Sequence, residues 1–481
     1  MATRVVARLS VDDADPLSVQ PPLYETPDER NARIALEQAA KARSDTIDEE
    51  LERMRASERR GPKPIKILLL GQSESGKSTT LKNFQLMYDL KSFRAQRASW
   101  RAVIQLNVVR SIHSILDAMT RAEKYDHGPS SSTSSKGDLP LLTPELLAIK
   151  SRLEPLVEVE KMLIRRLTSA GSGEIEATQL QTTNGTVVLP KSSPKEVAIN
   201  STIPWRSAFN KLVGSADRGS FESEDGIDWD DPDDPGPVLH SASEHMKQLW
   251  ASPIIQQLLE KENVRLEQLS GFFLDSLDRV TAARYIPTDD DILRARLKTL
   301  GVSEHRFKIS TSGSVRDWKV YDVGGHRSQR AAWAPYFDDM DAIIFLAPIS
   351  CFDQVLEEDH KVNRLEDSFK LWTMIVSNQL LKNTNLILFL NKIDILRTKL
   401  ASGIKLRDYV VSYQDRPNDV ESTTSYLKRK FGGILHERSP LPRVFYCHLT
   451  TVTDTNSTNR ILSNLKDMLM RQNLMKTNLI S

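Results

Sequence analysis

The sequence is poor in cysteine and has no excess of charge of either sign. Cys351 and Cys447 are the two cysteines among 481 residues, which excludes a disulfide scaffold and a zinc module with several cysteine ligands. Lys and Arg together number 65 and Asp and Glu 64, so the net charge of +1 gives no general attraction to nucleic acid or to an anionic membrane. We therefore expect a protein of a reducing compartment, with no nucleic acid among its partners.

Long apolar runs are also missing. Apolar runs such as 67–70 and 386–390 are the size of strands and fall well short of the roughly 20 residues that span a bilayer. Residues 1–4 hold no apolar core of a signal peptide. The absence of both features predicts an intracellular protein, and the chain length predicts about two to four domains.

The N-terminal part divides into a polar tail and a helix. Residues 1–27 are polar and rich in proline, which predicts a disordered tail. Residues 28–60 contain no Gly or Pro, and their few apolar residues recur at helical spacing. This pattern predicts one long, exposed helix whose thin apolar stripe needs a partner.

The remainder of the chain alternates between strand and helix patterns, with one long helical interruption. A buried strand at 65–70 is followed by a turn and a helix from Lys77, and helical patterns recur over 93–119, 143–168, 245–283, 365–381 and 459–476. Strand patterns occupy 306–311, 315–321, 341–347, 385–390 and 443–449, and a turn at 312–313 would join the first two as a hairpin. The alternation predicts a mostly parallel α/β sheet covered on both faces, interrupted by a helical block at 93–288.

A large stretch inside this block, about 123–242, differs in composition from its surroundings. Residues 128–135 are rich in serine and resemble a linker. The segment 222–234 is strongly acidic, and we interpret it as a solvated loop, with an interaction surface as the alternative.

The turn after the first strand matches a phosphate-binding loop. Residues 71–78 are Gly-Gln-Ser-Glu-Ser-Gly-Lys-Ser, the pattern G-x-x-x-x-G-K-[ST], with an apolar strand before it and a helix after it. Backbone N–H groups of such a loop and of the helix N-terminus point at phosphate oxygens. Lys77 would place a positive charge on the outer phosphates, and the Ser78 hydroxyl can bind Mg²⁺.

A second motif, Asn391-Lys392-Ile393-Asp394, directly follows the strand 385–390. A carboxylate can accept hydrogen bonds from guanine N1–H and its exocyclic amine together, whereas adenine offers no such pair of donors. A buried Asp394 would therefore favour guanine, because its lone pairs would stay unmatched with the wrong base. Four residues alone are a weak signal, but together with the phosphate loop they indicate a guanine nucleotide site at the strand ends.

Together with several further motifs, the phosphate loop and the guanine motif make the chain resemble the α subunits of heterotrimeric G proteins. The additional motifs are 277–279 (Leu-Asp-Arg), 291–299 (Asp-Ile-Leu-Arg-Ala-Arg-Leu-Lys-Thr), 322–328 (Asp-Val-Gly-Gly-His-Arg-Ser), 363–364 (Asn-Arg) and 450–454 (Thr-Thr-Val-Thr-Asp). The resemblance implies a P-loop GTPase domain, residues 61–92 and 289–481, with a mostly parallel six-stranded sheet. It implies that an all-helical domain, 93–288, interrupts the GTPase domain and contains the enlarged insertion at about 123–242.

The resemblance also implies the roles of individual residues. Arg296 would be an arginine finger supplied within the chain, and His326 would stand where the family has the glutamine that orients the attacking water. Ser78 and Thr299 would bind Mg²⁺, Asp322 would hold it through water, and Gly325 would offer its N–H to the γ-phosphate. The remaining contacts to GTP or GDP would come from Glu74, Ser75, Gly76, Lys77, Thr79, Leu269, Leu293, Arg294, Asn391, Lys392, Asp394 and Val452.

The partners that the resemblance implies are a βγ dimer, a seven-helix receptor at the C-terminal tail and an effector at the switch regions. The sequence departs from the family in that Gly does not follow Met1, and no cysteine precedes Cys351 or occurs in the last five residues. We therefore expect a cytoplasmic protein that reaches the inner face of the plasma membrane indirectly, through its partners.

Three functions compete. The first is a GTP-hydrolysing signalling switch, which Arg296 favours; the second is a nucleotide-dependent binding module that barely hydrolyses GTP. Ser73, in place of the family's usual glycine, and His326 favour the second or a slow version of the first. A third, an ATP-using P-loop kinase, is disfavoured by the guanine motif at 391–394.

Overall fold

The computed structural model describes residues 26–60, 63–126, 140–167, 227–262, 264–311, 314–356 and 358–476, with the short pieces 182–183, 186–187 and 198–200. These residues form two units, Met1–Lys63 and Pro64–Ser481. The tail predicted at 1–27 lies outside the described residues except for its last two, and Pro27 already belongs to a helix.

The first unit contains the long helix α1 (Pro27–Arg60), which confirms the helix predicted at 28–60. The larger apolar side chains that the structure describes on this helix include Leu36, which is 72% exposed, and Ile47, which is 52% exposed. Salt bridges between residues four apart, such as Arg33 with Glu37, support a helix that has no core of its own.

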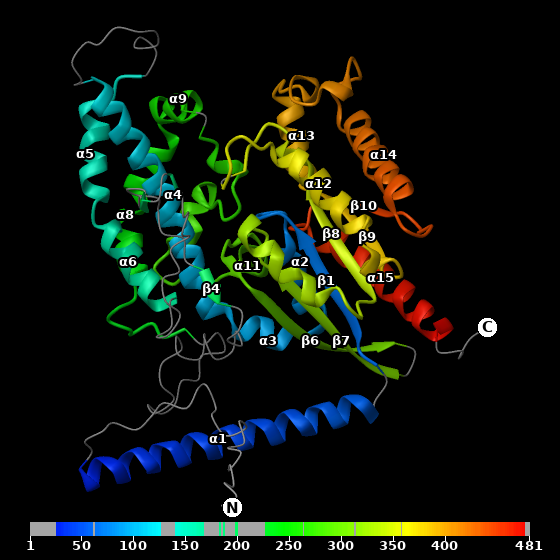
Figure 1. Ribbon diagram of the computed structural model, residues 1–481. Helices are drawn as coiled ribbons and strands as arrows, with labels where there is room; N and C mark the ends of the chain where they lie inside the picture. Colours follow the sequence, from blue (N-terminus) through cyan, green and yellow to red (C-terminus); the bar gives the residue numbers. More distant parts are fainter. Residues whose placement is uncertain are drawn as a thin grey trace, which may run out of the picture. The chain divides into compact units, whose positions relative to one another are not determined.

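The second unit is built on a six-stranded sheet, as predicted (Figure 1). The strands are β1 (Ile65–Gly71), β6 (Val302–Thr311), β7 (Ser314–Val323), β8 (Ala342–Pro348), β9 (Asn385–Asn391) and β10 (Tyr446–Thr450), in the spatial order β10-β9-β8-β1-β7-β6. All neighbours pair in parallel except β6 and β7, which form the predicted antiparallel hairpin. The predicted turn at 312–313 lies outside the described residues.

Helices cover both faces of this sheet because its central strands are apolar on both sides. Along β1, Leu68 and Leu70 pack on one face and Ile67 and Leu69 on the other. The first face is covered by α12 (Arg364–Val376), α13 (Ile393–Ala401) and α14 (Val420–Arg438), and the second by α2 (Lys77–Tyr88) and α15 (Thr455–Lys476). All the parallel strands end at one edge, where the loops after β1, β7 and β9 meet.

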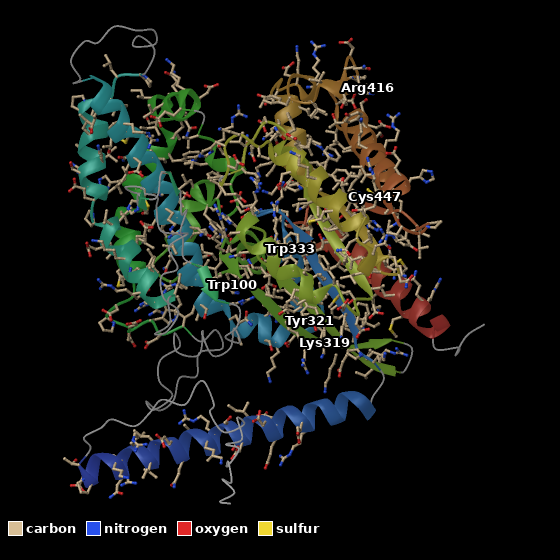
Figure 2. All side chains as sticks on the ribbon, in the orientation of Figure 1. Trp100, Lys319, Tyr321, Trp333, Arg416 and Cys447 are labelled. Carbon is tan, nitrogen blue, oxygen red and sulfur yellow. The ribbon has the colours of Figure 1, made fainter. Side chains whose placement is uncertain are left out.

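A separate hydrophobic core joins the helices of the middle segment. These helices are α3 (Leu90–Ala95), α4 (Arg97–Asp126), α5 (Pro144–Leu153), α6 (Leu156–Leu167), α8 (Gly236–Ala251), α9 (Pro253–Lys261), α10 (Leu277–Val280) and α11 (Asp289–Arg294). Two predicted helices are divided: 93–119 breaks at Gln96, and 143–168 breaks near Pro155, because proline cannot donate a helical hydrogen bond. Trp100 of α4, labelled in Figure 2, is 2% exposed within this core, as predicted.

The acidic segment 222–234 is not simply a solvated loop, and in this respect our interpretation was wrong. Asp234 and Arg101 form a bidentate pair in which both side chains are 7% exposed, and Asp231 pairs with Arg166. These arginines lie on α4 and α6, so the described end of the acidic segment is anchored to the helical core. Residues 222–226 lie outside the described residues.

Short strands complete the fold. Strand β2 (Thr182–Thr183) pairs with β3 (Thr186–Val187), and β4 (Ala198–Asn200) pairs in parallel with β5 (Lys298–Leu300). A 3₁₀ helix, η3 (Arg327–Tyr336), follows β7. None of the described helices combines the length and the apolar character needed to cross a membrane.

Candidate functional site

The phosphate loop lies between β1 and α2 and has the backbone that such a loop requires. Gly71 and Gly76 have positive φ angles of 145° and 104°. A Cβ at Gly76 would lie 2.5 Å from the Asn391 side-chain nitrogen, so any larger residue would clash there. Lys77 Nζ donates to the carbonyls of Gly71 (3.1 Å) and Gln72 (2.6 Å). Burial lowers the pKa of Lys77 to about 8, although Asp322 opposes this shift.

Three oxygen-bearing side chains converge beside this loop. Ser78 Oγ donates to Asp322 Oδ2 at 2.6 Å and lies 3.0 Å from Thr299 Oγ1, which is itself 3.5 Å from Asp322 Oδ2. Burial raises the pKa of Asp322, which is 2% exposed, and its Oδ1 atom is buried without a hydrogen-bond partner. Two hydroxyls and a carboxylate with unused acceptor capacity are the hard oxygen ligands that Mg²⁺ prefers, so these residues fit that ion.

The predicted arginine finger is held over the loop by a carboxylate. Arg296 Nη1 lies 2.7 Å from Glu74 Oε1, and Arg364 Nη1 lies 3.3 Å from Glu74 Oε2. Burial alone would raise the pKa of Glu74, but the positive charges of Arg296, Arg364 and Lys392 lower it to about 2. Arg364 also donates to the Ser73 carbonyl at 2.8 Å, which ties α12 to the phosphate loop.

The guanine motif is joined to the phosphate loop by Asn391. Its Nδ2 donates to the Ser75 carbonyl at 2.8 Å, and its Oδ1 accepts from the Val452 N–H at 3.2 Å. The Val452 N–H predicted to lie near the base is therefore bonded to Asn391 in this structure. Asp394 is exposed at the cavity rim, not buried as predicted, because it lies in the first turn of α13 beyond the strand end.

Gly325 and His326 follow β7 and lie beside the loop. A Cβ at Gly325 would lie 2.4 Å from the Ser73 nitrogen and 2.3 Å from the Gln72 carbonyl carbon, so only glycine fits this approach. His326 Nδ1 lies 2.8 Å from Ser328 Oγ and accepts from the Ser328 N–H at 3.4 Å. The imidazole therefore caps the start of η3.

The phosphate loop, the oxygen cluster, Arg296 and the guanine motif line one cavity of about 350 Å³. Every residue predicted for nucleotide, metal or catalytic contact is among its walls: Glu74, Ser75, Gly76, Lys77, Ser78, Thr79, Leu269, Leu293, Arg294, Arg296, Thr299, Asp322, Gly325, His326, Asn391, Lys392, Asp394 and Val452. The walls come from both the sheet edge and the helical segment around Leu269, which places the cavity between the two cores.

Sequence reasoning missed residues that hold the backbone around Arg296. Lys82 on α2 donates to the Ile292 carbonyl (2.8 Å) and the Ala295 carbonyl (2.9 Å), and it lies over the Trp100 ring. Burial lowers the pKa of Lys82 to about 7. The sequence could have indicated this role, because Lys82 lies one helical turn after Ser78 among apolar residues of the same helix. Asn107, which contacts Arg296, had no such local signal.

The sheet order, the loop after β1 and the oxygen cluster at the strand ends define a P-loop GTPase fold with a helical insertion. Residues 41–469 match the family described as G-protein alpha subunit, and the chain belongs to this family, as predicted. The match covers the whole sheet and most of α1.

Named relatives agree with this assignment. The guanine nucleotide-binding protein alpha-4 subunit of Mycosarcoma maydis is 31% identical, with 100% of this chain and 97% of the relative covered. The guanine nucleotide-binding protein subunit alpha of Coprinellus congregatus is 28% identical over 92% of this chain and 97% of the relative. The alpha-1 subunit of Saccharomyces cerevisiae is 27% identical over 92% of this chain and 96% of its own. The chain is thus an α subunit of a heterotrimeric G protein with fungal relatives.

Proposed function

We propose that this α subunit is a slow GTPase that couples a seven-helix receptor to an effector. The observation that carries the proposal is the convergence of Lys77, the Ser78–Thr299–Asp322 oxygens, Arg296 and the guanine motif on one cavity. Each of these groups suits one part of a nucleoside triphosphate, and together they suit its hydrolysis.

Binding would use the ends of the strands. The loop N–H groups and the N-terminus of α2 face phosphate oxygens, and Lys77 adds a positive charge there. Asp394 would select guanine by accepting from its two donors. Ser78 and Thr299, with Asp322 behind them, would hold Mg²⁺, which neutralises negative charge on the outer phosphates when it is bound.

Hydrolysis would depend on two further residues. Arg296 would move from Glu74 to the γ-phosphate and neutralise the charge that develops there. His326 would orient the attacking water, and Gly325 would offer its N–H to the γ-phosphate. The domains would be those of the sequence prediction, 61–92 with 289–481 for the GTPase part and 93–288 for the helical part.

The alternative is a binding module with little GTPase activity, and particular contacts favour it. His326 Nδ1 interacts with both the hydroxyl and the backbone N–H of Ser328, and these contacts hold the ring at the start of η3. Ser73 adds a side chain next to the close approach of Gly325 to the loop. Both features support a slow hydrolytic step while leaving the phosphate and base contacts intact.

The partners would be those of the family. The exposed apolar stripe of α1 would bind a βγ dimer, the C-terminal tail would bind the receptor, and the segments around Thr299 and Gly325 would bind the effector. The chain would then lie at the inner face of the plasma membrane through these partners.

One experiment separates the two functions. Single-turnover GTP hydrolysis by the purified chain is measured beside its affinity for a non-hydrolysable GTP analogue, with Arg296→Cys as the control. Slow hydrolysis that falls further in Arg296→Cys, with analogue affinity retained, supports the switch. Tight binding with a rate equal to that of Arg296→Cys supports the binding module.

A further inference from the structure

The main chain of Arg296 is held by a side chain from the helical core. Asn107, on α4, accepts from the Arg296 N–H through Oδ1 at 2.8 Å and donates through Nδ2 to the Arg296 carbonyl at 3.0 Å. Asn107 is 9% exposed and lies 189 residues before Arg296 in the chain. One amide thus satisfies both backbone groups of Arg296, as a neighbouring strand would.

The two carbonyls before this point are held as well, each by a different element. The Arg294 carbonyl accepts from the Gly271 N–H at 3.1 Å, and the Ala295 carbonyl accepts from Lys82 at 2.9 Å. A Cβ at Gly271 would lie 2.7 Å from Asn107 Oδ1 and 2.9 Å from Arg296 Cβ, so this packing is tight. Asn107 is the contact that acts on Arg296 itself.

We propose that Asn107 is a positioning residue for hydrolysis: its amide fixes the backbone of Arg296 so that the guanidinium can reach the γ-phosphate. The inference rests on the proposed role of Arg296. An asparagine amide carries both a donor and an acceptor, so it can hold one residue's N–H and C=O at once and fix the direction of that residue's side chain. A displacement of about 1 Å in a catalytic group can cost about 100-fold in rate.

Asn107 does not line the nucleotide cavity. Its loss should therefore act on the rate of hydrolysis and leave nucleotide affinity nearly unchanged. Because α4 belongs to the helical core, the contact also makes the position of Arg296 depend on that core.

The test compares Asn107→Leu, which removes both hydrogen bonds at similar volume, with Asn107→Asp, which keeps the acceptor and loses the donor. Gln105→Leu is the matched control, because Gln105 is a buried amide (3% exposed) two residues earlier on the same helix. Each variant is measured for single-turnover GTP hydrolysis and for affinity toward a non-hydrolysable GTP analogue. Asn107→Leu is also combined with Arg296→Cys.

We expect Asn107→Leu to lower hydrolysis about 10- to 100-fold, Asn107→Asp to lower it less, and both to keep analogue affinity within about threefold. Gln105→Leu should hydrolyse GTP at the wild-type rate. In the Arg296→Cys background, Asn107→Leu should cause no further loss, because it acts only through the guanidinium.

Several results would overturn the inference. These are an unchanged rate in Asn107→Leu, an equal loss in Gln105→Leu, or an equal further loss in the Arg296→Cys background. If neither Asn107 variant binds the analogue, the residue serves folding and the inference is wrong. An Arg296→Cys variant with wild-type hydrolysis would instead overturn the proposed function, so the two failures can be told apart.

Discussion

Arg296 and Glu74 form an ion pair, with Nη1 2.7 Å from Oε1, in which the side chains are 25% and 12% exposed. Glu74 also contacts Arg364, so one buried carboxylate balances two guanidinium groups next to the phosphate loop. The carboxylate keeps the Arg296 guanidinium at the site and offsets the positive charges of Arg296 and Arg364 there. Removal of Glu74 should therefore destabilise the empty site more than the nucleotide-bound site.

We predict that Glu74→Gln destabilises the nucleotide-free protein by about 3 kcal/mol, because it removes the one negative charge that Arg296 and Arg364 share beside the phosphate loop. Bound phosphates would compensate that charge, so the gain in melting temperature on adding GDP should be larger than in the wild type. Thermal unfolding with and without GDP measures both effects. Glu366→Gln, which removes an exposed partner of Lys370, is the control and should change little.

The same pair has a defined pH dependence. The pKa of Glu74 is about 2 in the folded chain against an ordinary value of 4.5, so its stabilisation is complete above pH 4.5. It is lost as the pH falls from 4.5 to 2. Wild type should therefore lose more stability than Glu74→Gln over that window, and equal losses in urea unfolding would contradict the assigned pairing.

Guanine selectivity is predicted to depend on Asp394. The carboxylate is exposed at the rim and accepts from Thr451 Oγ1 at 3.4 Å, so no buried charge is lost when it is replaced. Asp394→Asn should weaken GTP binding at least about tenfold, or about 1.4 kcal/mol, and improve binding of xanthine nucleotide. Competition between the two nucleotides measures this, and a variant that prefers GTP by the wild-type margin would refute it.

The part of the insertion between α6 and the anchored end of the acidic segment, 168–226, is predicted to be dispensable for nucleotide affinity but not for the order of β5. Its strand β4 pairs with β5 so that Ile199 lies opposite Thr299, whereas the phosphate and base contacts come from other parts of the chain. Replacing 168–226 with a short Gly-Ser linker, which keeps α5, α6 and the anchored Asp231 and Asp234, should leave GDP affinity near wild type, because loop closure entropy grows slowly with length. Backbone N–H groups of 298–300 should then exchange hydrogen faster. A large loss of GDP affinity would show that the insertion supports the whole site.

Membrane attachment is predicted to be indirect. Helix α1 exposes Leu36 and Ile47, and its first unit has no hydrophobic core of its own among the described residues, which suits docking on a βγ dimer. Fractionation without βγ should leave the chain off membranes, and coexpression with βγ should recruit it. Persistent association without βγ would disprove indirect attachment.

Local patterns predicted the sheet and the site motifs but not the contacts between distant residues. The strands and the loops after them were found because apolar runs and glycine-bounded turns are local signals. Helix α14 was missed because Gly432 and Gly433 lower its helical propensity, while in the fold the Phe445 ring packs against Gly432. The hydrogen bonds between Asn107 and Arg296 join residues far apart in sequence, and no periodic pattern in the sequence predicts them.

The slow rate is predicted to come from Ser73 and His326. The Ser73 carbonyl is fixed by Arg364, and Gly325 approaches the Ser73 nitrogen so closely that a Cβ would lie 2.4 Å from it. The loop and the segment after β7 are therefore packed closely at Ser73. We expect the Ser73 side chain to restrict how these two segments rearrange around a γ-phosphate. His326 is engaged with Ser328, and its ring has a shorter reach than a glutamine amide.

The test reverses both residues. Ser73→Gly combined with His326→Gln should raise single-turnover hydrolysis at least about tenfold, which corresponds to about 1.4 kcal/mol of barrier, with analogue affinity unchanged. Each single reversion should give part of the gain, and Ser328→Ala should distinguish loosening of the ring from its replacement, because it removes the Oγ contact to Nδ1 while keeping imidazole. Imidazole can itself orient water, so His326 could simply substitute for glutamine. If the double reversion leaves the rate unchanged while Arg296→Cys abolishes it, the impaired-switch hypothesis is wrong and an ordinary G-protein cycle stands.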